Sequence, residues 1–116
     1  MHALIIEDES LIAMVIENVL RDCGFSSIAF AMSEADAVAG ASRQCPDLIT
    51  CDVRLNPGSG IEAIGSICQH KPIPVIFVTG SPDEARARYP DHVVLIKPFT
   101  DAALRRAIAS VMAGTA

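Results

Sequence analysis

Polar side chains follow four apolar runs of the sequence, each at the point where the run ends. The runs are residues 3–6, 48–51, 74–78 and 93–96, and the side chains that follow them are, in order, Glu7 with Asp8, Asp52, Thr79 and Lys97. Burying an unpaired ammonium at the end of an apolar strand is costly. The Lys97 ammonium must therefore either reach solvent or lie beside an anion.

The other members of this set indicate which anion that is. Three carboxylates held within a few ångströms repel one another, and a divalent cation relieves the repulsion. Ligands that are all oxygen suit Mg²⁺, which commonly binds one or two carboxylates together with phosphate. The Asp52 carboxylate can attack phosphorus to form an aspartyl phosphate. Lys97 and the Thr79 hydroxyl would then each meet a phosphoryl oxygen, because phosphoryl transfer depends mainly on positioning and charge neutralisation.

Each of these residues also has a simpler explanation when it is taken alone. Glu7 and Asp8 could be solvated acids near a helix N-terminus, and Asp52 could cap a turn. Thr79 could be an ordinary strand residue, and Lys97 a surface lysine. It is their joint occurrence at successive strand ends that favours a site.

Short apolar runs alternate with helical patterns along the chain, which predicts the elements that must position these side chains. The predicted strands are Ala3–Ile6, Ser26–Phe30, Leu48–Cys51, Pro74–Val78 and Val93–Ile96. Apolar residues at helical spacing mark the helices, at residues 11–20, 33–43, 61–67, 81–89 (a short one, stopped by Pro90) and 104–111. This alternation predicts an α/β fold with a doubly wound parallel sheet covered on both faces. Sites in such sheets form beyond the carboxyl ends of the strands.

The chain as a whole sets further limits. Its 116 residues predict one domain, residues 1–116, with no effector domain. The apolar runs are far shorter than the ~20 residues that cross a bilayer, so we expect a cytoplasmic protein with no membrane partner. A net charge of −5 argues against nucleic acid as a partner. The cysteines show no paired spacing, and we expect reduced, buried thiols.

Several motifs together resemble the receiver domain of two-component response regulators. They are Glu7-Asp8-Glu9, Asp52-Val53-Arg54-Leu55, Gly60 with Glu62, Thr79-Gly80 and Lys97-Pro98-Phe99, and the resemblance covers essentially the whole chain. It implies a flavodoxin-like (βα)5 fold with strand order 2-1-3-4-5. It also implies a signalling domain, not an enzyme, whose Asp52 is phosphorylated by a histidine kinase or a histidine phosphotransfer protein.

The same resemblance implies ligands and backbone geometry. Glu7, Asp8, Asp52 and the backbone carbonyl of Arg54 would hold Mg²⁺, and the peptide bond before Pro98 would be cis. More narrowly, residues 3–9 and 74–79 resemble receivers of the alphaproteobacterial general stress response. Without a sigma-like domain, this chain would match the stand-alone kind, which acts through phosphorylation-dependent protein–protein interaction.

Three departures separate the sequence from most receivers. Val94 stands where many carry an aromatic switch residue, the stretch from Thr79 to Lys97 is short by about one helical turn, and Pro57 falls one residue late. The first two put the usual aromatic–threonine switch and the standard output face in question.

Other functions fit the sequence less well. A phosphatase-type hydrolase would need a second acid where Arg54 stands, and a flavin carrier would need a phosphate loop where the acids 7–9 stand. Two alternatives within the receiver family stay open. One is a phosphate sink that drains a kinase, and the other is a degenerate receiver that binds partners without being phosphorylated.

Overall fold

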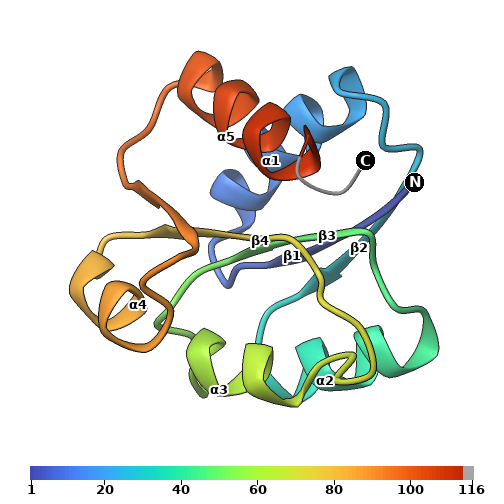
Figure 1. Cartoon of the computed structure of the whole chain (residues 1–116), viewed down its shortest axis with the longest axis vertical. Helices are drawn as coiled ribbons and strands as arrows, with labels where there is room; N and C mark the ends of the chain where they lie inside the picture. The colour runs from blue at the N-terminus through green and yellow to red at the C-terminus, as the bar shows by residue number, and fades with distance from the viewer. Residues whose placement is uncertain (114–116) are drawn as a thin grey trace.

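The computed structural model describes residues 1–113, which form five strands and five helices in strict alternation (Figure 1). Their bounds are β1 His2–Ile6, α1 Ser10–Asp22, β2 Ser27–Ala31, α2 Glu34–Arg43, β3 Leu48–Cys51, α3 Gly60–Ser66, β4 Val75–Thr79, α4 Pro82–Arg88, β5 Val93–Ile96 and α5 Asp101–Ala113. The strands make one parallel sheet of order β2-β1-β3-β4-β5. The predicted flavodoxin-like topology and the short fourth helix are confirmed, and residues 114–116 of the predicted domain lie outside the described residues.

Two layers of helices cover the sheet. Helices α1 and α5 lie on one face, and α2, α3 and α4 lie on the other (Figure 1). Successive strand side chains point to opposite faces, so each inner strand supplies both cores. Strands β1, β3 and β4 are buried along their whole length, which explains why they read as continuous apolar runs.

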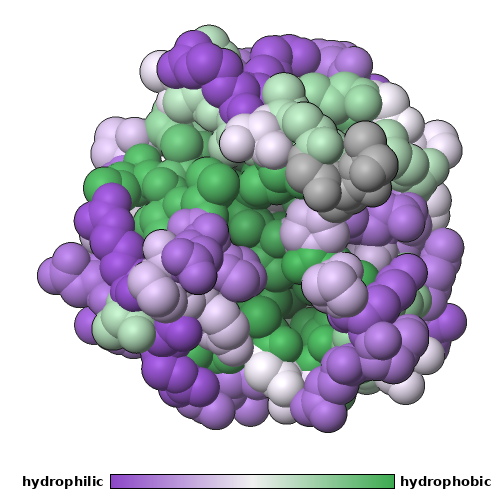
Figure 2. All heavy atoms as spheres, viewed as in Figure 1, coloured by the Kyte–Doolittle hydropathy of each residue, from purple (hydrophilic) through white to green (hydrophobic). Residues whose placement is uncertain are grey.

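The outer strands are less covered. The edge strand β2 is partly exposed, and β5 at the other edge has only half-buried residues and the exposed Ile96. Figure 2 shows apolar atoms reaching the surface between the two helical layers. None of the described helices is long and apolar enough to cross a membrane.

Some predicted boundaries move by one residue. Strand β4 begins at Val75 because Pro74 has no N–H for the sheet, although its carbonyl accepts a hydrogen bond from the N–H of Ile49 at 3.0 Å. At the other end of the strand, Thr79 is the last residue of β4, paired with Ile96 of β5, rather than the first residue beyond the strand.

Helix α4 begins without a side-chain cap. Pro82 occupies its first turn, and the Ser81 side chain before it makes no capping hydrogen bond. Ser81 instead donates its own backbone N–H to the Thr79 hydroxyl, at 3.0 Å. The entry to α4 is thereby joined directly to the end of β4.

The expectation of four reduced thiols is wrong for two of the cysteines. Cys45 and Cys68 form a disulfide with their Cα atoms 6.2 Å apart, while Cys23 and Cys51 are free. Cys45 lies between α2 and β3, and Cys68 follows α3. The 23-residue separation hid the pair, because only the folded topology brings these two connections together.

Candidate functional site

The carboxyl ends of β1 and β3 place two carboxylates side by side. Ile6 is paired with Cys51 in the sheet, and the Asp52 N–H donates to the Ile6 carbonyl at 2.9 Å. Glu7 and Asp52 therefore leave neighbouring strands at the same level. Both side chains are buried, which is unusual for carboxylates without partners.

Four acids gather at this edge of the sheet. Glu7, Asp8, Glu9 and Asp52 each offer a carboxylate oxygen, and these oxygens all lie within 4.8 Å of one another. The sequence predicted three of them. Glu9, which is exposed, belongs to the motif Glu7-Asp8-Glu9 but is not among the predicted ligands. Its place beside two other acids was the available signal, but its orientation depends on where α1 begins.

The Lys97 ammonium lies inside this group of acids. Its Nζ is 2.8 Å from Glu7 Oε1, 2.9 Å from Asp52 Oδ2 and 3.6 Å from Glu9 Oε1. The side chain is only 15% exposed, so it does not extend into solvent. Of the two explanations for a lysine at a strand end, the structure shows the one in which the lysine faces anions.

Burial and ion pairing shift the pKa values of this group in opposing ways. Burial raises the pKa of Glu7, and its hydrogen bond to Lys97 offsets only part of that effect. Burial alone would lower the pKa of Lys97, but hydrogen bonds to Glu7 and Asp52 outweigh it and the net shift is upward. The lysine's ion pairs therefore stabilise the fold below its ordinary pKa of 10.5, and this contribution is lost as the pH rises through the higher folded-state pKa.

Thr79 and Arg54 lie at the same edge. The Thr79 hydroxyl accepts the Ser81 N–H, and its own proton stays available to donate. The Thr79 carbonyl accepts the Lys97 N–H at 3.0 Å, which fixes the start of the lysine's segment. The Arg54 side chain is 73% exposed and pairs with Glu84 of α4 at 2.9 Å.

The donor set fits a hard divalent cation. Carboxylate oxygens from Glu7, Asp8 and Asp52 converge from two strand ends, and the group carries more negative charge than Lys97 alone neutralises. Mg²⁺ prefers such oxygens and retains several waters, which an open edge like this one permits. When bound, the ion would neutralise oxygens of an incoming phosphoryl group.

A peptide bond to proline directly follows Lys97. It is cis, as the resemblance implied, and a second cis bond joins Asn56 to Pro57 in the loop after β3. That loop is further held by Glu34 of α2, whose Oε1 accepts the Ser59 N–H at 3.0 Å.

Gly60, the first residue of α3, packs closely against the backbone of Asp52. Its N–H donates to the Val53 carbonyl at 2.8 Å, and a Cβ at position 60 would run into the Asp52 carbonyl and the Cys51 sulfur. No flexible side-chain end is available to yield, because the obstructing oxygen belongs to the backbone. Only glycine allows this approach. The receiver resemblance includes Gly60, but the sequence gives no physical reason why this position must be glycine.

Gly60→Ala is expected to lower the free energy of unfolding by about 2–3 kcal/mol through this overpacking. It should also weaken Mg²⁺ binding, because the Asp52 backbone must shift. Urea unfolding and a metal titration followed by NMR measure the two effects. The matched control is Gly65→Ala in the same helix, where the nearest atom is an ordinary contact at 3.7 Å. That change should be neutral or stabilising by up to ~1 kcal/mol, and an equal loss in both variants would contradict the role given to Gly60.

The family model for the response regulator receiver domain matches residues 3–109. The chain belongs to this family. It is 36% identical over 113 residues to the phyllosphere-induced regulator PhyR of Methylorubrum extorquens, a match that takes in 94% of this chain and 42% of that protein. The receiver therefore spans less than half the length of that relative.

Solved structures agree. The receiver domain of PhyR from Erythrobacter litoralis superposes with a TM-score of 0.86 at 30% identity, covering 96% of this chain and 88% of the other. The anti-anti-sigma factor PhyR from Bartonella quintana gives a TM-score of 0.82 at 31% identity, covering 98% of this chain and 48% of that one. The resemblance to receivers of the general stress response is confirmed by these matches. The family match also favours a receiver over the hydrolase and the flavin carrier.

Proposed function

We propose that this receiver accepts a phosphoryl group on Asp52 from a histidine kinase or a histidine phosphotransfer protein. The observation that carries the proposal is the Lys97 ammonium, held between Asp52 and Glu7 within a group of four acids. A carboxylate between a cation and a metal-binding set is arranged to become an acyl phosphate whose charge its neighbours neutralise.

The chemistry uses the side chains as they lie. An Asp52 oxygen attacks the phosphorus of the donor, a new O–P bond forms, and the bond from phosphorus to the donor's imidazole nitrogen breaks. The imidazole leaves with the electron pair and takes up a proton. Lys97 turns from the carboxylate to a phosphoryl oxygen, and the Thr79 hydroxyl donates to another.

For the metal, we propose Mg²⁺ held by Glu7, Asp8, Asp52 and the Arg54 carbonyl. The last of these depends on the loop after β3, which Gly60 and the Glu34 side chain hold in place.

We further propose that this receiver acts in the cytoplasm as a signalling domain, with protein partners and no catalytic turnover of its own. Its similarity to PhyR receivers supports a role in general stress signalling. Its output would be a phosphorylation-dependent contact with another protein. Val94 has no aromatic ring that could act as the switch. Helix α4 would instead change its position on phosphorylation, because Ser81 at its start is hydrogen-bonded to Thr79.

The test is phosphorylation by a small phosphodonor such as phosphoramidate. We expect the mass of one phosphoryl group to be added in the presence of Mg²⁺ and almost none in EDTA, and peptide mapping should place it on Asp52. Asp8→Ala should behave in Mg²⁺ as the wild type does in EDTA. A folded wild-type protein that gains no phosphoryl group under these conditions would be a degenerate receiver, and the proposal would fail.

A further inference from the structure

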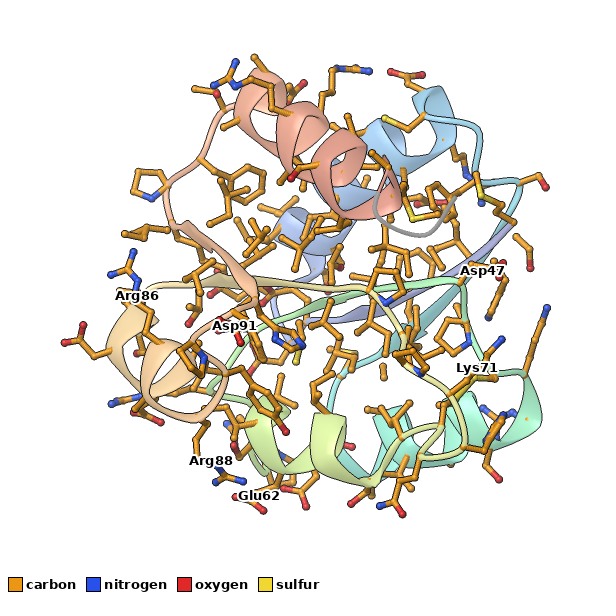
Figure 3. All side chains as sticks on the ribbon, viewed as in Figure 1. Asp47, Glu62, Lys71, Arg86, Arg88 and Asp91 are labelled. Carbon is orange, nitrogen blue, oxygen red and sulfur yellow. A yellow bond between two sulfur atoms is a disulfide. The ribbon has the colours of Figure 1, made fainter. Side chains whose placement is uncertain are left out.

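Cys45 and Cys68 join two connections at the end of the sheet opposite to Asp52. Cys45 lies just before β3 begins at Leu48, whereas Asp52 follows the last residue of that strand. In Figure 3 the labelled Asp47 and Lys71 mark the two connections, which enter β3 and leave α3 on the same side of the molecule. The disulfide closes a ring of the chain that contains β3, the loop after β3 that begins with Asp52, and α3.

The backbone at Cys68 gives a second, independent observation. Cys68 follows the C-cap of α3, Ile67, and has a φ of +45°. This is the left-handed position at a helix end where glycine is favoured, because a Cβ there is crowded by the backbone. A cysteine occupies it at a conformational cost. The side chain must therefore contribute something that glycine cannot, and the thiol is what it adds.

The bridge is open to reagents. Both cysteines are half-buried, and Cys68 borders two pockets of about 360 Å³ each, one of them lined also by Ser66 and His70. Cys68 is therefore not enclosed in the core, and reagents can approach it from the side of either pocket. The free Cys51 is the opposite case, since burial raises the pKa of its thiol and keeps it protonated and unreactive.

We propose that Cys45 and Cys68 are a reversible thiol–disulfide modification site, oxidised and reduced by low-molecular-weight disulfides and thiols of the glutathione type. The inference rests on the proposed cytoplasmic location, where disulfides are usually transient or redox-sensing, and it does not depend on phosphorylation. In the oxidising direction the two thiols lose two electrons and two protons as their S–S bond forms. The small disulfide takes these up as its own bond breaks into two thiols.

The expected consequence is a change in stability, with the phosphoacceptor chemistry unchanged. The bridge closes a loop of 23 residues and so restricts the unfolded chain. Its reduction should lower the melting temperature by about 10 °C, the shift typical for a loop of this size in a domain of this length. The Asp52 group lies beyond the far end of β3 and should be phosphorylated at the same rate in both forms.

The experiment equilibrates the full chain in glutathione buffers of graded redox ratio, alkylates it under denaturing conditions and counts free thiols by mass. We expect four free thiols in reducing buffers and two in oxidising ones, with the disulfide mapped to Cys45 and Cys68 and the transition reversible. Four thiols in every buffer would overturn the proposal. So would a bridge that no glutathione buffer reduces, because it would then be a permanent structural link.

Matched variants separate the bridge from local packing. The melting temperature of Cys45→Ser should no longer respond to the redox ratio, whereas Cys23→Ser should respond as the wild type does. Under reducing conditions Cys68→Gly should be more stable than Cys68→Ser, because glycine relieves the left-handed backbone. If Cys68→Gly is no more stable than Cys68→Ser, a side chain at position 68 carries no conformational cost. The argument from the positive φ of Cys68 would then be wrong.

Discussion

Asp52→Asn is expected to abolish phosphoryl incorporation from both a small phosphodonor and a histidine kinase. The amide has the size and shape of the carboxylate but is a far weaker nucleophile toward phosphorus. The fold should survive. The variant loses a charge-assisted hydrogen bond to Lys97 but also relieves crowding among the four acids. Because these effects oppose each other, we expect the free energy of unfolding to change by less than about 1 kcal/mol.

The measurement is the intact mass after incubation with donor and Mg²⁺, with circular dichroism to confirm the fold. Asp91→Asn is the control, since Asp91 is an exposed carboxylate on the connection into β5 (labelled in Figure 3), before the start of the strand whose other end leads to Lys97. It should incorporate phosphoryl groups as the wild type does. Equal incorporation by Asp52→Asn and the wild type would show that another residue is the acceptor.

The strand ends were predictable because two physical rules act together there. Buried parallel strands read as short apolar runs, and the first polar residue after each run marks the sheet edge where sites form. These rules predict Glu7, Asp52 and Lys97 as site residues. The structure places a carboxylate oxygen of Glu7 and one of Asp52 within 3 Å of the Lys97 ammonium. The spacing alone could not show that Thr79 ends β4 rather than follows it, since that depends on the pairing of Thr79 with Ile96 of β5.

The role of other features is decided by contacts between distant segments. Gly60 and Glu9 stand in motifs of the receiver resemblance, but only the approach of α3 to the Asp52 carbonyl shows why position 60 must be glycine. The disulfide needs two connections that meet only after the sheet forms. Glu9 is the N-cap residue of α1, and the structure places its carboxylate with the other three acids. Local rules thus predicted where the site lies, and tertiary packing determined what supports it.

The charge of Lys97 is expected to contribute to the stability of the fold. Lys97→Met, which keeps an unbranched side chain of similar length and removes its charge, is expected to destabilise the metal-free protein by about 3 kcal/mol. The reason is that Glu7 and Asp52 are then buried without a cation, and breaking one side of such a pair leaves uncompensated charge. A lysine that pointed into solvent would produce almost no effect.

Magnesium should reverse much of this loss. The ammonium competes with the ion for the same carboxylates, and a positive charge a few ångströms away is worth on the order of 1 kcal/mol or more of repulsion. Lys97→Met should therefore bind Mg²⁺ roughly tenfold more tightly than the wild type, and saturating metal should raise its melting temperature by a larger amount. Its phosphorylation should nevertheless be impaired, because no ammonium is left to neutralise the phosphoryl oxygen.

Thermal unfolding in EDTA and in Mg²⁺, together with a metal titration, measures these effects. The control comes from the chain's only other lysine, Lys71, which is exposed on the connection after α3 (Figure 3). Lys71→Met removes the same charge from the protein but should change neither the stability in EDTA nor the metal affinity beyond ~0.5 kcal/mol. If Lys97→Met binds Mg²⁺ more weakly than the wild type, the lysine assists the metal rather than competing with it. That result would contradict the proposed competition between Lys97 and Mg²⁺ for the Glu7 and Asp52 carboxylates.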